Sequence, residues 1–273
     1  MIRFARKDDF ARIQILWEAV FGDSPDNIDA FLSAHFSVDA GLLFLEGGAL
    51  CGMLWMLPLT LISGNMEYPA RYVYAVATDP AFRGRGIATD LIERAHDVMA
   101  ACGEAASLLV PASESLFGYY AKRGYRTAFS IDVAEFGASA LESFPADGTS
   151  GPCAPRAFAQ IRDAAFSGSS LYARWDEGAV AYACAGMSLT RLARGDGVGC
   201  ALWEQDGDGV LVRELALLGM RVSDAMAILH RTVGASSYRV RLPGGDMPFG
   251  MIKWLIPEPR GARGPGYLSL ALD

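Results

Sequence analysis

The spacing of apolar residues changes abruptly within residues 72–89, YVYAVATDPAFRGRGIAT. This segment constrains the fold more than any other. Its first part alternates as a strand does, its middle holds two closely spaced glycines, and from Ile87 apolar residues recur at helical spacing. Glycine lets the backbone adopt positive φ and lets a bulky group approach, while a helix N-terminus presents unpaired N–H groups and a partial positive charge. A strand, a glycine-rich loop and a helix start in this order predict a pyrophosphate-binding site.

Two other interpretations of this loop compete with a pyrophosphate site. A glycine-rich helix start is often a flexible turn without any ligand. The dinucleotide-binding fingerprint G-x-G-x-x-G requires a third glycine where Thr89 stands, and it belongs early in a parallel β-α-β unit. Here the loop follows strands that tight turns would join as an antiparallel meander, at residues 42–46, 49–62 and 71–78. The dinucleotide interpretation therefore fails on context.

At this loop the sequence resembles the GNAT acyltransferase family, whose pyrophosphate loop has the pattern Q/R-x-x-G-x-G/A. Arg83, Gly86 and Ala88 fill the three specified positions. Further on, the block FGYYAKRGY at residues 117–125 resembles the family's pattern Y-x-K-x-G-F/Y. This second block aligns Tyr120 with the family's functional tyrosine.

The resemblance extends from Ile2 to about Val133 and implies an α/β (α+β) fold of the GNAT type. Such a fold has a mixed, mostly antiparallel sheet flanked by helices. The resemblance also implies acetyl-CoA as the co-substrate and a small-molecule or peptide amine as the acceptor. The uncharged amine would attack the thioester directly, without a covalent enzyme intermediate.

The resemblance gives each part of the site a task. Backbone N–H groups at the helix start would hold the pyrophosphate, and the preceding strand would hydrogen-bond the pantetheine arm as a neighbouring strand does. Tyr120 would protonate the departing thiolate, since a phenol stays protonated at neutral pH; its alternative role is that of a core aromatic. The residues implied to contact the coenzyme are Val76, Ala77, Thr78, Arg83, Gly84, Arg85, Gly86, Ile87, Ala88, Thr89 and Ser115.

The base that deprotonates the amine is left open by the sequence. Asp23, Asp26 and His35 fall in the region that forms the acceptor side in the family, yet each also suits a helix cap or a surface position. A water relay is an equal alternative. Four apolar side chains at helical spacing would form either the wall of the acceptor pocket or part of the core: Trp17, Phe21, Leu32 and Phe36.

Pro, Gly and Ser concentrate in PADGTSGPCAPR, where the apolar periodicity stops. We therefore expect a catalytic domain over residues 1–144, a linker over 145–156 and a second domain over 157–273. The second domain repeats the order of hairpin, helix and strand, but its loop at residues 219–223, GMRVS, lacks the R-x-x-G-x-A pattern.

In the last part of the chain we expect a short helix at residues 249–255 and a final strand at 267–272. The helix offers no tyrosine in the place of Tyr120. We interpret the second half as a degenerate GNAT-like domain without a coenzyme site. The arrangement is similar to the first two domains of the enhanced-intracellular-survival (Eis) acetyltransferases.

Charge and composition exclude several classes of protein. The net charge of −7, without a long run of Lys and Arg, argues against nucleic-acid binding and tRNA-dependent transfer. The N-terminus, MIRFARKDD, lacks the apolar run of a signal peptide, and we expect no membrane association and a cytoplasmic location. The oligomeric state is not predicted.

No metal site is expected, because the three histidines lie far apart and the cysteines form no Cys-x-x-Cys pair. We expect the cysteines to be small buried apolar residues. They are Cys51, Cys102, Cys153, Cys184 and Cys200.

The predicted function is transfer of the acetyl group of acetyl-CoA to a primary amine. One alternative within the same class is a mycothiol-synthase-like acetyltransferase, since that enzyme also joins two GNAT domains. An alternative from another class is a non-catalytic acetyl-CoA sensor, which a position of Tyr120 far from the thioester would favour.

Overall fold

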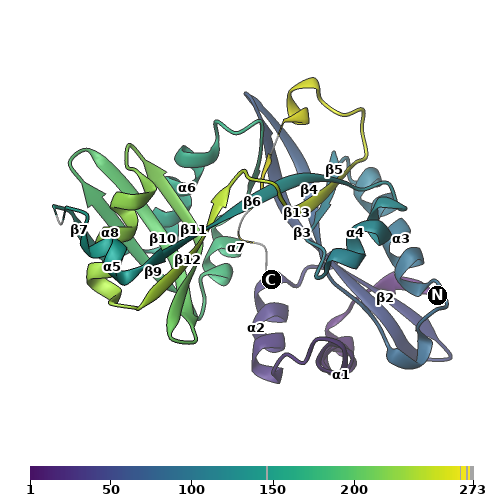
Figure 1. Ribbon diagram of the computed structural model, residues 1–273. Helices are drawn as coiled ribbons and strands as arrows, with labels where there is room; N and C mark the ends of the chain where they lie inside the picture. Colours follow the sequence, from purple (N-terminus) through teal and green to yellow (C-terminus); the bar gives the residue numbers. More distant parts are fainter. Residues whose placement is uncertain (146, 265, 269, 271–273) are drawn as a thin grey trace. The chain divides into compact units, whose positions relative to one another are not determined.

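The computed structural model describes residues 1–145, 147–264, 266–268 and 270, which form two compact units (Figure 1). The first unit comprises Met1–Leu61, Glu67–Arg126 and Met251–Glu258. The second comprises residues 62–66, residues 127–250 and the described residues from Pro259 onward. Each unit therefore contains segments from both halves of the sequence.

The first unit is built on a sheet with the strand order β1-β2-β3-β4-β5-β13. Strand β2 pairs antiparallel with β1 and β3, and β5 pairs antiparallel with β13. Strands β4 and β5 are parallel because helix α3 forms the crossover between them. This is the mixed sheet that the sequence predicts. The elements are β1 (Ile2–Phe4), η1 (Lys7–Asp9), α1 (Phe10–Phe21), α2 (Pro25–His35), β2 (Gly41–Glu46), β3 (Ala49–Ser63), β4 (Met66–Thr78), η2 (Pro80–Phe82), α3 (Ile87–Ala101), β5 (Ala106–Leu109), α4 (Glu114–Ala121) and β13 (Met247–Trp254).

Helices cover both faces of this sheet (Figure 1). On one face, Leu91 and Ala95 of α3 pack with Leu54 and Met56 of β3 in a buried apolar cluster. On the other face, aromatic rings of α1 and α2 meet those of β3 and β4, with Phe31 against Trp55 at 5.5 Å between ring centroids. The alternation of side chains along β3 therefore supplies two cores at once.

Strand β13 corrects the helix expected at residues 249–255. Met251 to Trp254 pair antiparallel with Leu109 to Ala106 of β5. Residues 249–252 are all buried, so the strand is covered on both faces and shows no alternation of apolar and polar residues. Periodicity cannot distinguish such a short apolar run from a buried helix.

The second unit repeats the strand relations of the first. Its sheet follows the order β6-β12-β11-β10-β9-β7, with β9, β10 and β11 antiparallel. Strands β11 and β12 are parallel across α8, and β12 pairs antiparallel with β6. The elements are β6 (Arg126–Gly137), α5 (Ala138–Glu142), β7 (Thr149–Pro152), α6 (Pro155–Phe166), β8 (Leu171–Arg174), α7 (Glu177–Ala183), β9 (Ser188–Arg194), β10 (Gly197–Asp206), β11 (Gly209–Leu218), α8 (Val222–Val233), β12 (Ser237–Pro243), η3 (Arg260–Arg263) and β14 (Gly266–Tyr267).

The two halves of the sequence exchange strands. In the first unit, the partner of β5 is β13, which comes from the second half of the sequence. In the second unit, the partner of β12 is β6, which directly follows the first half. The units therefore part after Arg126 and not within residues 145–156, where β7 and the start of α6 lie. The final strand expected at residues 267–272 falls partly outside the described residues.

Three of the cysteines are buried as expected, namely Cys51, Cys184 and Cys200. Cys102 is exposed at the end of α3 and Cys153 is half-buried, so the expectation is wrong for these two. In the part of the chain that the structure describes, no helix combines the length and the apolar run needed to cross a bilayer. Among the same residues, no group of His, Cys, Asp and Glu side chains is arranged to hold a metal ion.

Candidate active site

Strands β4 and β5 part at their carboxyl ends. Their parallel pairing runs from Ala70 to Tyr72 on β4. Ala75 then adopts a φ of 47°, a left-handed value that residues with a Cβ rarely take and that interrupts the regular strand. Residues 76–78 lie beyond both points, so this end of β4 has an edge that β5 does not cover. An extended ligand can hydrogen-bond such an edge as a neighbouring strand would.

The loop after β4 leaves open space in front of the α3 N-terminus. Gly84 and Gly86 have φ of 76° and 82°, which explains why glycine occupies both positions. A Cβ added to either would meet no atom within 4 Å. Gly86 is the N-cap of α3, and no side chain caps the first N–H groups of the helix. These donors are free to bind an anion.

Gly52 of β3, which the sequence analysis missed, fixes how closely α3 approaches the sheet. A Cβ at this position would lie 2.7 Å from Cγ2 of Ile87 and 3.0 Å from the carbonyl oxygen of Ala77. Ile87 is buried as the first residue of α3, whereas Ala88 and Thr89 are half-buried. The absence of a side chain on β3 therefore sets the position of the loop and the helix start together.

The two loop arginines have different surroundings. The Arg83 side chain is exposed, and its Nε donates to the carbonyl oxygen of Thr78 at 3.4 Å. The Arg85 guanidinium donates to both carboxylate oxygens of Glu46 at 2.7 and 2.8 Å, and about half of each side chain is exposed. An exposed pair of this kind is weak, so an incoming phosphate can compete for Arg85.

Tyr120 lies on α4, inside the apolar cluster between α3 and the sheet. Burial raises the pKa of its phenol to about 12, with a further contribution from Tyr119. Among the contacts of the described residues, none is a hydrogen bond to the Tyr120 hydroxyl. Ser115 is exposed in the first turn of α4, where its hydroxyl contacts that of Ser113 at 3.0 Å.

Arg123 joins the end of α4 to the first turn of α3. Its guanidinium stacks on the Tyr119 ring at 3.3 Å from the centroid, donates to the Tyr119 carbonyl oxygen at 2.6 Å, and donates to Oγ1 of Thr89. No functional role for this residue was expected from the sequence. Its only signal is its place within the block at residues 117–125, at a position that the family pattern leaves unspecified.

A chain of hydrogen bonds runs behind Tyr120. The Tyr125 hydroxyl contacts Oγ of Ser107 at 2.6 Å and Nε2 of His96 at 2.9 Å. Nδ1 of His96 lies 3.0 Å from Nζ of Lys253 on β13. Burial and the charge of Lys253 lower the pKa of His96 to about 4, and burial also lowers the pKa of Lys253. The Tyr125 ring packs against Tyr120 at 5.8 Å between centroids, so the exchanged strand supports the site.

The acceptor-side candidates have structural contacts. Asp23 accepts a hydrogen bond from Nε1 of Trp17 at 2.7 Å, Asp26 lies in the first turn of α2, and His35 packs against Phe31. Among the pocket-wall candidates, Trp17 and Leu32 are buried, Phe36 packs against Phe10 and Phe21 is 43% exposed. The Tyr74 ring lies 5.9 Å from Trp17 and 5.3 Å from Phe31, on the part of β4 just before Ala75.

The N-terminal part of the chain matches a known protein family. Residues 1–128 match the family model described as an acetyltransferase (GNAT) domain. Residues 1–128, just under half of the chain, are therefore similar to a GNAT acetyltransferase domain. The GNAT match supports an acyltransferase in general, with acetyl-CoA as the donor that the family uses. A comparison with curated proteins finds no match.

Solved structures of GNAT proteins are similar to this chain over most of its length. A probable N-acyltransferase from Enterococcus faecalis is 16% identical with a TM-score of 0.76, covering 93% of this chain and 72% of that one. A GCN5-related N-acetyltransferase from Anabaena variabilis is 15% identical with a TM-score of 0.77, covering 94% and 73%. Eis1 from Mycobacterium abscessus is 15% identical with a TM-score of 0.67, covering 93% and 74%. At these identities the likeness shows the shared fold.

Proposed function

We propose that this protein transfers the acetyl group of acetyl-CoA to a primary amine of a small molecule or peptide, by direct attack of the amine. The observation that carries the proposal is the open, glycine-lined start of α3 beside the uncovered end of β4. The first would bind the pyrophosphate and the second the pantetheine arm, which together would fix the thioester in space.

In the proposed reaction the amine nitrogen attacks the thioester carbonyl carbon, the C–S bond breaks, and the thiolate takes a proton from the Tyr120 hydroxyl. A pKa of about 12 keeps this phenol protonated at neutral pH, as a proton donor requires. The amine loses its own proton to a base or to water. The hydrogen bond between Asp23 and Trp17 makes a structural role the simplest account of that carboxylate.

Charge near the loop supports the binding of an anionic coenzyme. Arg83 and Arg85 flank Gly84, and Arg123 reaches Thr89 in the first turn of α3. A cation close to a phosphate reinforces the N–H groups at the helix start. Val76, Ala77 and Thr78 would supply the pantetheine contacts, and Ser115 would reach the coenzyme only from the start of α4.

The start of α8 supports a second unit without a coenzyme site. Its N-cap is Arg221, and Asp224 stands buried in its first turn. Arg221 donates two hydrogen bonds of 2.9 Å to the Asp224 carboxylate, which also pairs with Arg194 at 2.7 Å. The hydrogen bonds from Arg221 lower the pKa of Asp224. The paired side chains of Arg221 and Asp224 therefore stand at the start of α8, whereas the start of α3 has the glycine-rich loop, and they would obstruct a pyrophosphate.

The test is release of coenzyme A thiol from acetyl-CoA across a panel of aminoglycosides, polyamines and peptides. Gly86→Ala places a Cβ at a φ of 82° in the loop, and the matched Gly103→Ala places one at 78° beyond the other end of α3. Both substitutions strain the backbone alike, by about 1–2 kcal/mol. Only Gly86→Ala is expected to raise the KM for acetyl-CoA. Tight acetyl-CoA binding without turnover on any acceptor would indicate that the protein is an acetyl-CoA sensor and not an enzyme.

A further inference from the structure

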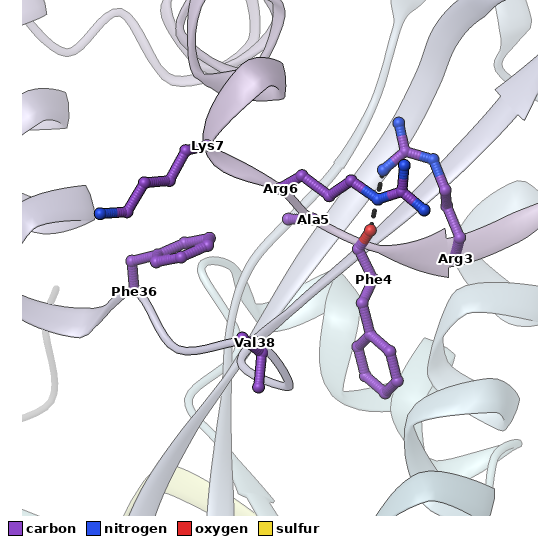
Figure 2. A pocket seen from close by; sticks show the side chains of 7 residues that line it. All are labelled: Arg3, Phe4, Ala5, Arg6, Lys7, Phe36 and Val38. Atoms are coloured by element: carbon purple, nitrogen blue, oxygen red, sulfur yellow. Dashed lines mark hydrogen bonds between the residues drawn. The ribbon is translucent and has the colours of Figure 1, made fainter.

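A hollow beside the N-terminal strand contains no residue of the α3 loop. Its volume is about 620 Å³, within the range of sites that hold small organic ligands. Figure 2 shows Phe36 and Val38 across the hollow from Phe4 and Arg6. The Val38 side chain is 80% exposed and so is accessible to a ligand at the edge of the hollow. Arg3, Ala5 and Lys7 complete the lining.

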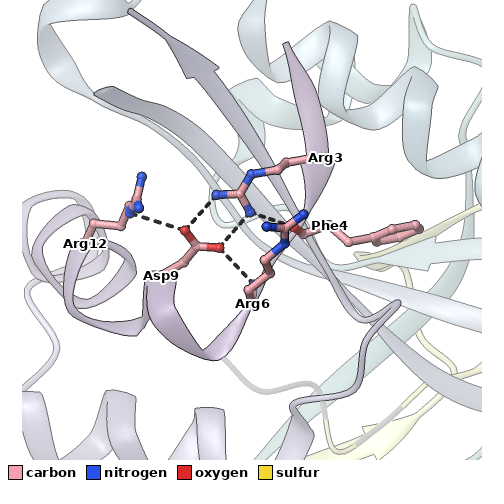
Figure 3. A network of polar contacts seen from close by, with 5 residues as sticks. All are labelled: Arg3, Phe4, Arg6, Asp9 and Arg12. Carbon is pink, nitrogen blue, oxygen red and sulfur yellow. Dashed lines mark hydrogen bonds and ion pairs between the residues drawn. The ribbon is translucent and has the colours of Figure 1, made fainter. Parts of the chain in front are cut away.

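The nearest buried acid is already engaged. Figure 3 shows the Asp9 carboxylate between the guanidinium groups of Arg3 and Arg12. Arg3 donates to both oxygens at 2.7 Å, the backbone N–H of Arg6 donates at 2.8 Å, and Nε of Arg12 lies at 3.2 Å. Hydrogen bonds from Arg3 lower the pKa of Asp9, so the group stays ionised. Asp39, which follows Val38, pairs with Arg71 at 2.6 Å.

The cations of the hollow therefore outnumber the acids. Arg3, Arg6 and Lys7 line the hollow, and Asp8 and Asp9 follow them directly, a local charge of three minus two, or +1, in a chain of net charge −7. Arg6 and Lys7 are exposed, and no ion pair to either is found among the described side chains. Two exposed cations without an ion pair among the described side chains thus stand on the rim of an apolar hollow.

We propose that this hollow binds an amphiphilic anion, a small molecule that carries a carboxylate or phosphate beside an apolar chain or ring. Arg6 and Lys7 would bind the head group, and Phe4, Phe36 and Val38 would cover the apolar part. Arg3 is held by Asp9 and keeps the strand end in place. The site shares no lining residue with the α3 loop, so we expect it to bind its ligand independently of the coenzyme.

The test is calorimetric titration of the full chain with octanoate and octyl phosphate, and with 1-octanol and acetate as controls. Octanoate and octyl phosphate are expected to bind with one-site saturation, and added salt should weaken both. The ligand with the higher affinity shows whether the site prefers a carboxylate or a phosphate head group. Octanol lacks the charge and acetate lacks the chain, so each is expected to bind at least about tenfold more weakly, a difference of about 1.4 kcal/mol. Saturating coenzyme A should leave the octanoate affinity unchanged.

Exposed positions allow variants that keep the fold. Arg6→Gln combined with Lys7→Gln is expected to weaken octanoate binding at least tenfold, and Val38→Glu is expected to abolish it by placing a negative charge on the rim. Arg94→Gln removes an exposed cation of α3 and should change nothing. Four results would each contradict the proposed binding site. They are equal binding of octanol and octanoate, competition by coenzyme A, no saturable binding, and unchanged affinity in the Arg6/Lys7 variant.

Discussion

Tyr120 is buried, and no described group is hydrogen-bonded to its hydroxyl. The role of this hydroxyl can therefore be tested by removing its oxygen atom alone. Tyr120→Phe keeps the ring and its packing against Tyr125 but removes the proton donor. We expect kcat to fall by about 10²-fold or more, with little change in the KM for acetyl-CoA. Steady-state kinetics beside Tyr119→Phe, which loses a hydroxyl 3.5 Å from Thr89, measures the difference. An unchanged kcat would remove the acid role from Tyr120.

His96 is expected to make the stability of the first unit depend on pH. Its pKa falls from 6.5 to about 4 in the folded protein, so between these values only the unfolded chain binds a proton at this group. Unfolding then takes up protons, and stability decreases as pH falls through this window. His96→Gln removes the titration, and its urea midpoint is expected to fall less between about pH 7 and pH 5 than that of the wild type. Parallel pH profiles for the two proteins would contradict this assignment.

At the scale of elements, β3 and α3 act as one unit because Gly52 has no side chain. Gly52→Ala would force Ile87 and the helix start outward, which is expected to raise the KM for acetyl-CoA and to lower stability by about 1–3 kcal/mol. Gly151→Ala is the matched control, since a Cβ there meets nothing within 4 Å. Enzyme kinetics and thermal unfolding of both variants separate an effect of packing from a general effect of losing glycine. Equal kinetics in the two variants would show that Gly52 does not position the loop.

Local patterns in the sequence predicted the elements whose signals are local. The strand, the glycines and the helix over residues 72–89 were all predicted, because glycine content and the change of period lie within one short stretch. Strand β13 was assigned to a helix, since burial on both faces erases the alternation that marks a strand. Arg123 and Gly52 were missed because their roles depend on neighbours distant in sequence: Thr89 for Arg123, and Ala77 with Ile87 for Gly52.

At the scale of the molecule, the exchange of strands decides which fragments can fold. A fragment of residues 1–126 lacks β13, so β5 keeps an unpaired edge and His96 loses Lys253. We expect this fragment to be unfolded or aggregated by circular dichroism and size-exclusion chromatography. Joining residues 247–258 through a flexible linker should restore a cooperative unfolding transition, and a scrambled segment should not. A stably folded 1–126 fragment would show that the exchanged strand is dispensable.

The whole chain is expected to bind a single acetyl-CoA. In the first unit α3 starts from the glycine-rich loop, whereas in the second the paired side chains of Arg221 and Asp224 stand at the start of α8. Equilibrium titration with coenzyme A measures the number of sites directly. A stoichiometry of two per chain would contradict the account of the second unit.

The exchange also sets an order of events during synthesis. A ribosome delivers the chain from its N-terminus, so β5 is complete long before β13 has been translated. Throughout that interval the growing polypeptide carries an open strand edge at β5, a state that is prone to aggregation. Completion of the first unit therefore waits until residues 247–254 have been translated, and a chain that stops before β13 would leave β5 without this partner.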